Sequence, residues 1–192
     1  MAVSLKKGGN VSLTKAVPAL KRILVGLGWN GQDSHGKEFD LDASAFLLNE
    51  RGKVRREEDF VFYHNLQSTC KSVEHTGDDK TGGGADDAEA IKIDLVNVPD
   101  AVKKIVICVS IYDEDNVGWN FGQVTDAYIR IVNLENDVEI ARFDLTEDFS
   151  METAAIFGEI YKHEGEWKFK AIGLGNSGGL EAICGQFGIN VA

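Results

Sequence analysis

The stretch DAYIRIVNLENDVEIARFDL, residues 126–145, decides the fold class. Residues 126–133 and 138–145 alternate apolar and polar side chains, as half-buried β-strands do, and the LEND segment between them is typical of a tight turn. Two strands joined by so short a turn run antiparallel. Residues 158–173, GEIYKHEGEWKFKAIG, predict a second hairpin that turns at His163, Glu164 and Gly165.

The rest of the chain indicates further short strands separated by turn residues. We expect strands at 22–29, 41–49, 59–63, 91–95 and 103–113, and a short helix at 178–186. Residues 150–161 fit a helix or a strand. The segment KKIVICVSIYD (103–113) is nearly continuous in apolar residues, which is typical of a central strand. No strand–helix–strand rhythm appears, which disfavours a parallel α/β sheet. The sequence predicts an all-β, two-sheet antiparallel β-sandwich of about ten strands with one or two short helices, as a single domain over residues 1–192.

Composition narrows the class of protein. The formal net charge is −11 over 192 residues, which argues against nucleic acid as a direct partner and is compatible with cation binding. Neither the N-terminus nor any other apolar run has the length of a signal peptide or a membrane span, so we expect a cytoplasmic protein. Cys70, Cys108 and Cys184 form no CxxC pair, and reduced thiols are expected. The three tryptophans, Trp29, Trp119 and Trp167, are expected in the core.

Side chains that could bind a metal ion are concentrated between residues 40 and 89. They are Asp40 and Asp42 in FDLDAS, Asn65 in YHNL, and Asp78, Asp79, Asp86, Asp87 and Glu89 in HTGDDKTGGGADDAE. Residues two apart in a strand face the same side, so Asp40 and Asp42 are expected to point at one site. Oxygen ligands without a Cys or His cluster favour Ca²⁺ or Mg²⁺, and the irregular geometry favours Ca²⁺. Solvated acidic turns are the alternative for each group.

Three other motifs suggest a different chemistry, and each departs from the class that it suggests. GLGWNG (26–31) matches GxGxxG, but the polar continuation QDSHGKEFD is not the helix that a dinucleotide site needs. Residues 78–89 differ from an EF-hand loop because Lys80 and Gly82 stand where oxygen ligands are required. The Asp40–Asp42 pair also fits a Mg²⁺-dependent phosphohydrolase with Asp40 as nucleophile. That class needs an apolar strand before the motif, whereas here the apolar strand follows it.

Several motifs together resemble the TerD family of tellurium-resistance and general stress proteins. The likeness runs nearly end to end and rests on KGGNVSL (7–13), VGLGW (25–29), FDLDASAFLL (39–48), FYHNL (62–66), HTGDDKTGGGADDAE (75–89), ARFDLTED (141–148), FGEIYKHEGEWKFKAIG (157–173) and the Gly-Ile-Asn ending. The resemblance implies a β-sandwich that binds two Ca²⁺ ions. The matching ligand positions are Asp40, Asp42, Asn65, Asp78, Asp79, Asp87 and Glu89.

The acidic loop departs from the family's usual GDNxTGxGxGDDE, since this chain reads GDDKTGGGADDAE. Ala85 and Ala88 stand where the family often has Asp, which puts the second Ca²⁺ ion in question. Asp86 lies one position away from a lost carboxylate and is therefore added as a candidate ligand.

The resemblance also implies a role without catalysis. The family is linked to resistance against tellurite, and against phage and colicins. We expect a Ca²⁺-dependent module of a larger complex, with other stress or tellurium-resistance proteins as partners and an association with the inner membrane surface. The sequence leaves the oligomeric state open. The Asp40 phosphohydrolase and a metal-free interaction scaffold are the alternative functions.

Overall fold

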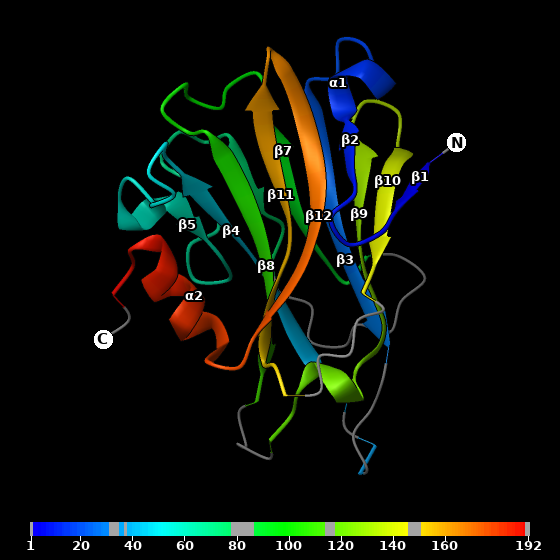
Figure 1. Cartoon of the computed structure of the whole chain (residues 1–192), viewed down its shortest axis with the longest axis vertical. Helices are drawn as coiled ribbons and strands as arrows, with labels where there is room; N and C mark the ends of the chain where they lie inside the picture. Colours follow the sequence, from blue (N-terminus) through cyan, green and yellow to red (C-terminus); the bar gives the residue numbers. More distant parts are fainter. Residues whose placement is uncertain are drawn as a thin grey trace.

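The computed structural model describes residues 2–30, 35–36, 38–77, 87–113, 118–145 and 151–190. Its strands form two six-stranded sheets that pack face to face (Figure 1). Sheet A has the order β1-β10-β9-β3-β7-β6 and sheet B the order β2-β12-β11-β8-β4-β5. The predicted all-β sandwich is confirmed, with twelve strands in the described residues where about ten were expected.

Sheet A contains the first predicted hairpin. The strands are β1 (Val3–Leu5), β3 (Arg22–Asn30), β6 (Val73–His75), β7 (Glu89–Asp94), β9 (Thr125–Asn133) and β10 (Val138–Asp144). Strands β9 and β10 pair antiparallel on either side of the LEND turn, as predicted. The pairing of β1 with β10 at the edge of the sheet is parallel, which the prediction of antiparallel sheets did not include.

Sheet B contains the second predicted hairpin. The strands are β2 (Asn10–Ser12), β4 (Asp40–Leu48), β5 (Phe60–Val61), β8 (Lys104–Tyr112), β11 (Ala154–His163) and β12 (Glu166–Asn176). Strands β11 and β12 turn at Glu164 and Gly165, where the sequence predicted. The segment that fitted either a helix or a strand is a strand from Ala154 onward, because its two faces are both covered.

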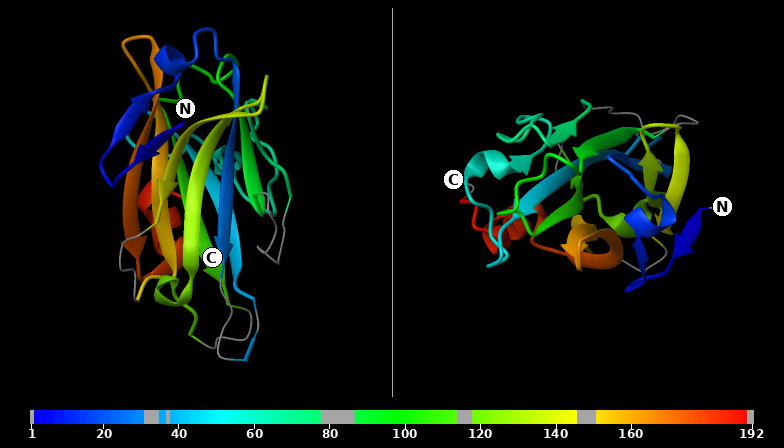
Figure 2. Two further views of the ribbon diagram at one scale, coloured as in Figure 1. Left: turned by 90° about the vertical axis from the view of Figure 1, so that its right-hand side faces the viewer. Right: turned by 90° about the horizontal axis from the view of Figure 1, so that it is seen from above.

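Strand β8 shows why one strand can be apolar throughout. Its inner side chains, such as Ile105 and Ile107, belong to the core between the two sheets. Its outer side chains, Val106 and Cys108, belong to a second cluster beneath helix α2 (Gly179–Phe187). Helix α2 covers part of the outer face of sheet B (Figures 1 and 2). Both faces of β8 are therefore buried, which explains the unbroken apolar run.

The N-terminal segment ties the two sheets together and was not predicted. Strand β1 lies at the edge of sheet A and β2 at the edge of sheet B. Gly8 turns the chain between them with φ of 80°, a conformation that glycine adopts without a steric penalty. Strands of three residues carry too little alternation to be read from the sequence. Helix α1 (Leu13–Ala16) follows β2 directly.

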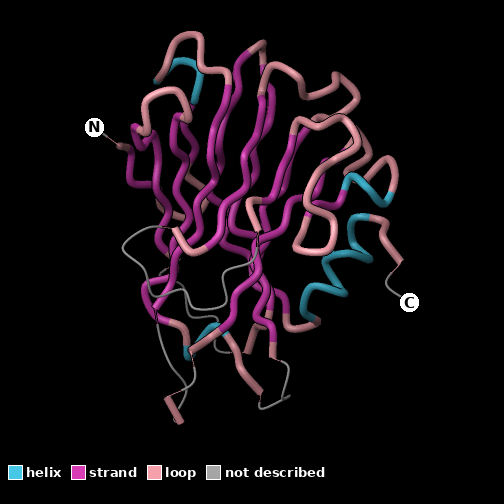
Figure 3. Tube along the Cα trace, turned by 180° about the vertical axis from the view of Figure 1, so that it is seen from behind, coloured by secondary structure: helices cyan, strands magenta, loops and turns pink. Residues whose placement is uncertain are grey.

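Helices are few and short (Figure 3). Besides α1 and α2, the described residues contain two single-turn 3₁₀ helices, η1 (Glu57–Asp59) and η2 (Phe121–Gln123). No helix in this part of the chain has the length and apolar character needed to cross a membrane. The fold also lacks the parallel α/β sheet on which the phosphohydrolase alternative depends, and Asp40 begins its strand instead of following one.

Candidate metal centre

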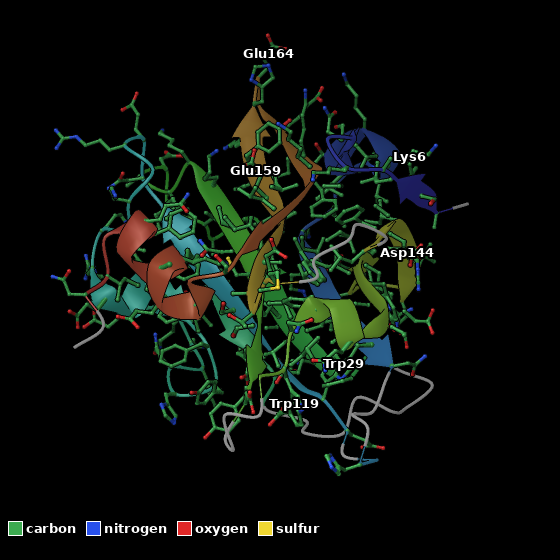
Figure 4. The ribbon with its side chains drawn as sticks, turned by 60° about the horizontal axis from the view of Figure 1, so that its bottom comes forward. Lys6, Trp29, Trp119, Asp144, Glu159 and Glu164 are labelled. Atoms are coloured by element: carbon green, nitrogen blue, oxygen red, sulfur yellow. The ribbon has the colours of Figure 1, made fainter. Side chains whose placement is uncertain are left out.

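An aromatic cluster fixes the start of β4, which carries the first predicted ligands. Phe39 is fully buried immediately before the strand. Its carbonyl oxygen accepts a hydrogen bond from Trp29 Nε1 at 2.9 Å, and its ring packs edge-on against Trp119 with centroids 5.2 Å apart. Trp29 and Trp119 lie toward the same end of the sandwich (Figure 4). Both are buried, as is Trp167, which confirms their prediction as core residues.

Asp40 and Asp42 lie on the outer face of β4. Leu41 and Ala43, which alternate with them, belong to the core between the sheets. Asp42 is only 8% exposed and lies opposite Ser110 of β8. A carboxylate this deeply buried is costly unless positive charge or hydrogen-bond donors compensate it.

Glu89 approaches β4 from the other sheet. It is the first residue of β7, and its side chain faces the core at 1% exposure. One carboxylate oxygen, Oε2, accepts a short hydrogen bond from the backbone N–H of Ala43. The other oxygen, Oε1, has no hydrogen-bond partner among the described residues. Since Ala43 follows Asp42 directly, the fold places these two carboxylates beside the same short piece of β4.

His75 completes the contact with the edge of β4. Its Nε2 lies 3.1 Å from the carbonyl oxygen of Ala43, and its Nδ1 accepts a hydrogen bond from the backbone N–H of Gly77 at 3.1 Å. A carbonyl can only accept, so we assign the proton to Nε2 and a neutral ring to His75. His75 Nε2 is 3.6 Å from Glu89 Oε2. A neutral ring does not supply the positive charge that Glu89 lacks.

Glu89 and His75 bond to the backbone of β4 where no neighbouring strand among the described residues pairs with it on that side. Strand β5 pairs with β4 only at Ala45 and Phe46, so it stops short of Ala43. Glu89 and His75 satisfy the Ala43 N–H and carbonyl groups, which would otherwise be buried without partners. Of the two carboxylate oxygens of Glu89, only Oε2 is thus bonded to the backbone of β4.

The residues that flank the acidic loop are both anchored near this position. Thr76 N–H donates to the Ala90 carbonyl at 3.0 Å, and Ala88 N–H donates to the Leu27 carbonyl at 2.9 Å. Three predicted ligands, Asp78, Asp79 and Asp86, lie outside the described residues. Within the residues that are described, no three His, Cys, Asp or Glu side chains gather in a metal-binding arrangement. The predicted metal site is thus neither confirmed nor contradicted.

Asp87 is held elsewhere. Its carboxylate lies on the outer face of sheet A, where Arg130 Nε donates to both oxygens at 2.8 and 3.0 Å and the Tyr128 hydroxyl donates to Oδ1 at 3.2 Å. The hydrogen bond with Asp87 raises the pKa of Arg130. Gly26 leaves the space for this pair, since a Cβ there would lie 2.1 Å from Asp87 Oδ2. Asp87 therefore already has a cationic partner and is separated from Glu89, with which it was grouped.

Asn65 occupies the turn after β5. Its amide Nδ2 donates to the Phe60 carbonyl at 2.6 Å, which orients the side chain. The backbone of Asn65 bridges to Phe62, closing the turn. The amide nitrogen is thus engaged with the backbone, and the Asn65 oxygen stays a predicted ligand. Asn65 also lines a surface groove, which is described below.

Two residues near the site were missed by reasoning from the sequence. His75 has the same phase as Val73 in the short strand VEH, so its alternation pointed inward, but three residues are too few to show it. Arg130 alternates with buried Ile129 and Ile131 in the predicted strand YIRIVN, which places it on the outer face. What the sequence could not show is that Asp87 lies against it.

The three cysteines are free, in agreement with the expectation of reduced thiols. Cys108 and Cys184, far apart in the sequence, belong to one buried cluster beneath α2. Burial raises the pKa of Cys108 well above its ordinary value and that of Cys184 to about 11. Cys70 is half-buried between the hydroxyls of Ser68 and Ser72, at 3.4 and 3.0 Å. Burial alone raises its pKa, but these hydrogen bonds and the nearby Arg55 charge outweigh it and lower the pKa.

The folded protein is therefore expected to expose one reactive thiol. A disulfide reagent such as DTNB should modify Cys70 quickly. The pH at which this rate is half-maximal should lie below the free-cysteine pKa of about 8.5. Cys108 and Cys184 should react only after denaturant is added, because both are buried protonated thiols. The Cys70→Ser variant should lose the fast phase and keep two thiols in denaturant. Three equally fast thiols in the native protein would contradict this assignment.

Comparison with known proteins identifies the relatives of this chain. Residues 1–187 match the TerD domain family. The chain is 56% identical to the tellurium resistance protein TerD of Serratia marcescens and 48% identical to general stress protein 16U of Bacillus subtilis, each over 192 residues and 100% of both chains. Its fold is similar to that of a TerD homologue from Streptomyces coelicolor A3(2), with a TM-score of 0.66 and 19% identity over 86% of this chain and 95% of that one.

Proposed function

Because this chain belongs to the TerD family of tellurium resistance and stress proteins, we propose that it is a non-enzymatic, calcium-binding module of the stress response. In this proposal Glu89, which reaches from sheet A to Ala43 of β4, would be one of the residues that hold the Ca²⁺ ion. The module acts in the cytoplasm by engaging other stress or tellurium-resistance proteins, in part at the inner membrane surface.

The observation that carries the proposal is the carboxylate of Glu89. It is buried at 1% exposure, and one of its oxygens has no hydrogen-bond partner among the described residues. Leaving a buried charged acceptor unsatisfied costs about 1–3 kcal/mol or more. The neutral His75 does not offset that cost. A cation at Oε1 would offset it, and an oxygen ligand suits Ca²⁺.

The other predicted ligands fit this position to different degrees. Asp42 is buried beside the Glu89 contact, and Asp40 shares its face of β4. Asp40, Asp42 and Glu89 do not by themselves gather in a metal-binding arrangement. We therefore propose that Asp78, Asp79 or Asp86 of the acidic loop supplies the ligands that complete a site with them. Asn65 would add a neutral oxygen. Asp87 fits less well because Arg130 already pairs with it, so the second of the two expected Ca²⁺ ions would need other ligands.

Calcium titration tests this function directly. Isothermal calorimetry of the protein, first freed of metal with chelator, should show saturable Ca²⁺ binding with one or two ions per chain. Mg²⁺ should bind more weakly, because it requires a near-ideal octahedron of ligands and gives up its bound water reluctantly. Heats no larger than dilution for both metals would contradict the proposal and favour the metal-free scaffold.

A further inference from the structure

A groove of about 650 Å³ opens between helix α2 and the segment from η1 through β5 to Asn65. Figure 1 shows α2 beside β5 at the edge of sheet B. Apolar walls come from Phe60 and Phe62 on one side and from Leu180 and Ile189 on the other. The volume is in the range of clefts that hold a drug-sized ligand or a pair of large side chains. Apart from Asn65, a candidate calcium ligand, the described residues that line this groove have no part in the function proposed above.

Stacked rings connect the groove to the protein interior. Phe46 of β4 stacks on Phe60 at 4.3 Å between centroids, and Phe60 stacks on Phe62 at 4.4 Å. Beyond Phe62, the rings of Tyr63 and His64 pack edge-on against each other at 4.3 Å. Phe46 is fully buried, whereas Phe62 and Tyr63 are half-buried and His64 is exposed. The series therefore ends at a rigid aromatic surface on which another apolar or aromatic group can pack.

The charged side chains that line the groove have one sign. Among the described residues its lining includes Glu57, Glu58 and Glu181, all exposed, and neither Lys nor Arg. Two of these carboxylates come from η1 and the third from the first turn of α2, so they lie on opposite walls. Acidic rims attract cationic partners and repel anionic ones. The net charge of −11 likewise disfavours a second copy of this chain as the occupant.

We propose that this groove binds a basic peptide segment of a partner protein, with an aromatic or branched apolar anchor between flanking lysines or arginines. The anchor packs on Phe62 and against Leu180. The flanking cations pair with Glu58 on one wall and Glu181 on the other. This assigns a docking surface to the outer edge of sheet B, apart from the contact between Glu89 and β4.

A designed peptide tests the chemistry of the occupant. Fluorescence anisotropy of a labelled Lys-Lys-Trp-Leu-Lys-Lys peptide, at low ionic strength, should show saturable binding to the full-length protein. The matched peptides Glu-Glu-Trp-Leu-Glu-Glu and Lys-Lys-Ala-Ala-Lys-Lys should each bind at least about tenfold more weakly, since one lacks the charge and the other the anchor. Equal binding of all three peptides would overturn the proposal.

Matched variants locate the binding on the protein. The double variant Glu58→Lys/Glu181→Lys should weaken binding of the basic peptide by about tenfold, while Glu50→Lys/Glu164→Lys, with the same change of charge at exposed positions outside the groove, should leave it within about twofold. Glu164 lies at the tip of the β11–β12 hairpin (Figure 4).

A second pair of variants tests the apolar wall. Leu180→Ser should weaken binding, and Leu174→Ser, at a residue that is 54% exposed and outside the groove, should not. Equal loss of binding within the charge pair would show that the peptide binds by net charge alone. Equal loss within the leucine pair would show that the apolar wall of the groove is not where it binds. Either result would contradict a groove site. So would a shift of the protein to a dimer that excludes the peptide, observed by analytical ultracentrifugation.

Discussion

Replacing Glu89 with Gln is expected to leave the protein folded and to remove most of its stabilisation by calcium. Glutamine keeps the shape of the side chain and can still accept the hydrogen bond from the Ala43 N–H. It removes the buried negative charge that a cation would neutralise. Calcium bound only to the folded wild-type protein adds about 2.7 kcal/mol to the free energy of unfolding at a hundredfold its dissociation constant. The variant should gain little.

The same substitution should have the opposite effect in chelator. Without metal, the wild-type protein buries a carboxylate with one oxygen that has no hydrogen-bond partner among the described residues, whereas the variant buries an uncharged amide in the same place, which costs less to remove from water. Glu89→Gln is therefore expected to be at least as stable as the wild-type protein in EDTA and less stable than it in Ca²⁺. Thermal unfolding of both proteins in both buffers measures this reversal in the order of their stabilities.

A matched control lies on the adjacent strand. Glu74→Gln makes the same chemical change at an exposed position of β6, next to His75. It should keep the wild-type response to calcium. An equal calcium-dependent shift in the Glu89→Gln protein would remove Glu89 from the set of ligands, whatever the outcome of calorimetry on the wild-type chain.

The strands were predictable from the sequence because they are long enough to display their pattern. Segments 126–133 and 138–145 pair as β9 and β10, and the unbroken apolar run at 103–113 correctly predicted a central strand, which is β8. Helix α2 was found within one residue of its ends. The strands that were missed, β1, β2 and β6, have three residues each, and partners distant in the sequence stabilise them.

The candidate site was predictable in composition and less so in geometry. Asp87 and Glu89 stand two apart, which in a regular strand would place them on one face. Strand β7 begins only at Glu89, and the bend at Ala88 turns Asp87 to the outer face of sheet A. Arg130 then holds Asp87 there. The contact of Glu89 with Ala43 joins two sheets, and such contacts depend on tertiary packing that no local pattern encodes.

Replacing Arg55 with Met is expected to destabilise the protein by about 3 kcal/mol, because it leaves a buried carboxylate without its cation. Asp59 is fully buried in η1, just before β5. Arg55 donates to it from Nε at 2.7 Å and from Nη2 at 2.9 Å, a two-pronged contact that raises the pKa of the guanidinium. The arginine side chain is 21% exposed, so water relieves part of the cost. Urea unfolding of the variant and wild-type proteins measures the difference.

The partner substitution separates loss of the ion pair from loss of packing. With Asp59→Asn added, the buried negative charge disappears. The amide oxygen at position 59 can still accept a hydrogen bond from the backbone N–H of residue 55, which in the wild-type protein donates to Asp59 Oδ2 at 3.3 Å. The double variant should therefore recover at least half of the lost free energy of unfolding, since removing both charges costs much less than removing one. If the double variant were no more stable than Arg55→Met alone, the cost would lie in the lost packing of the arginine stem, and the ion pair would not be what stabilises this part of the fold.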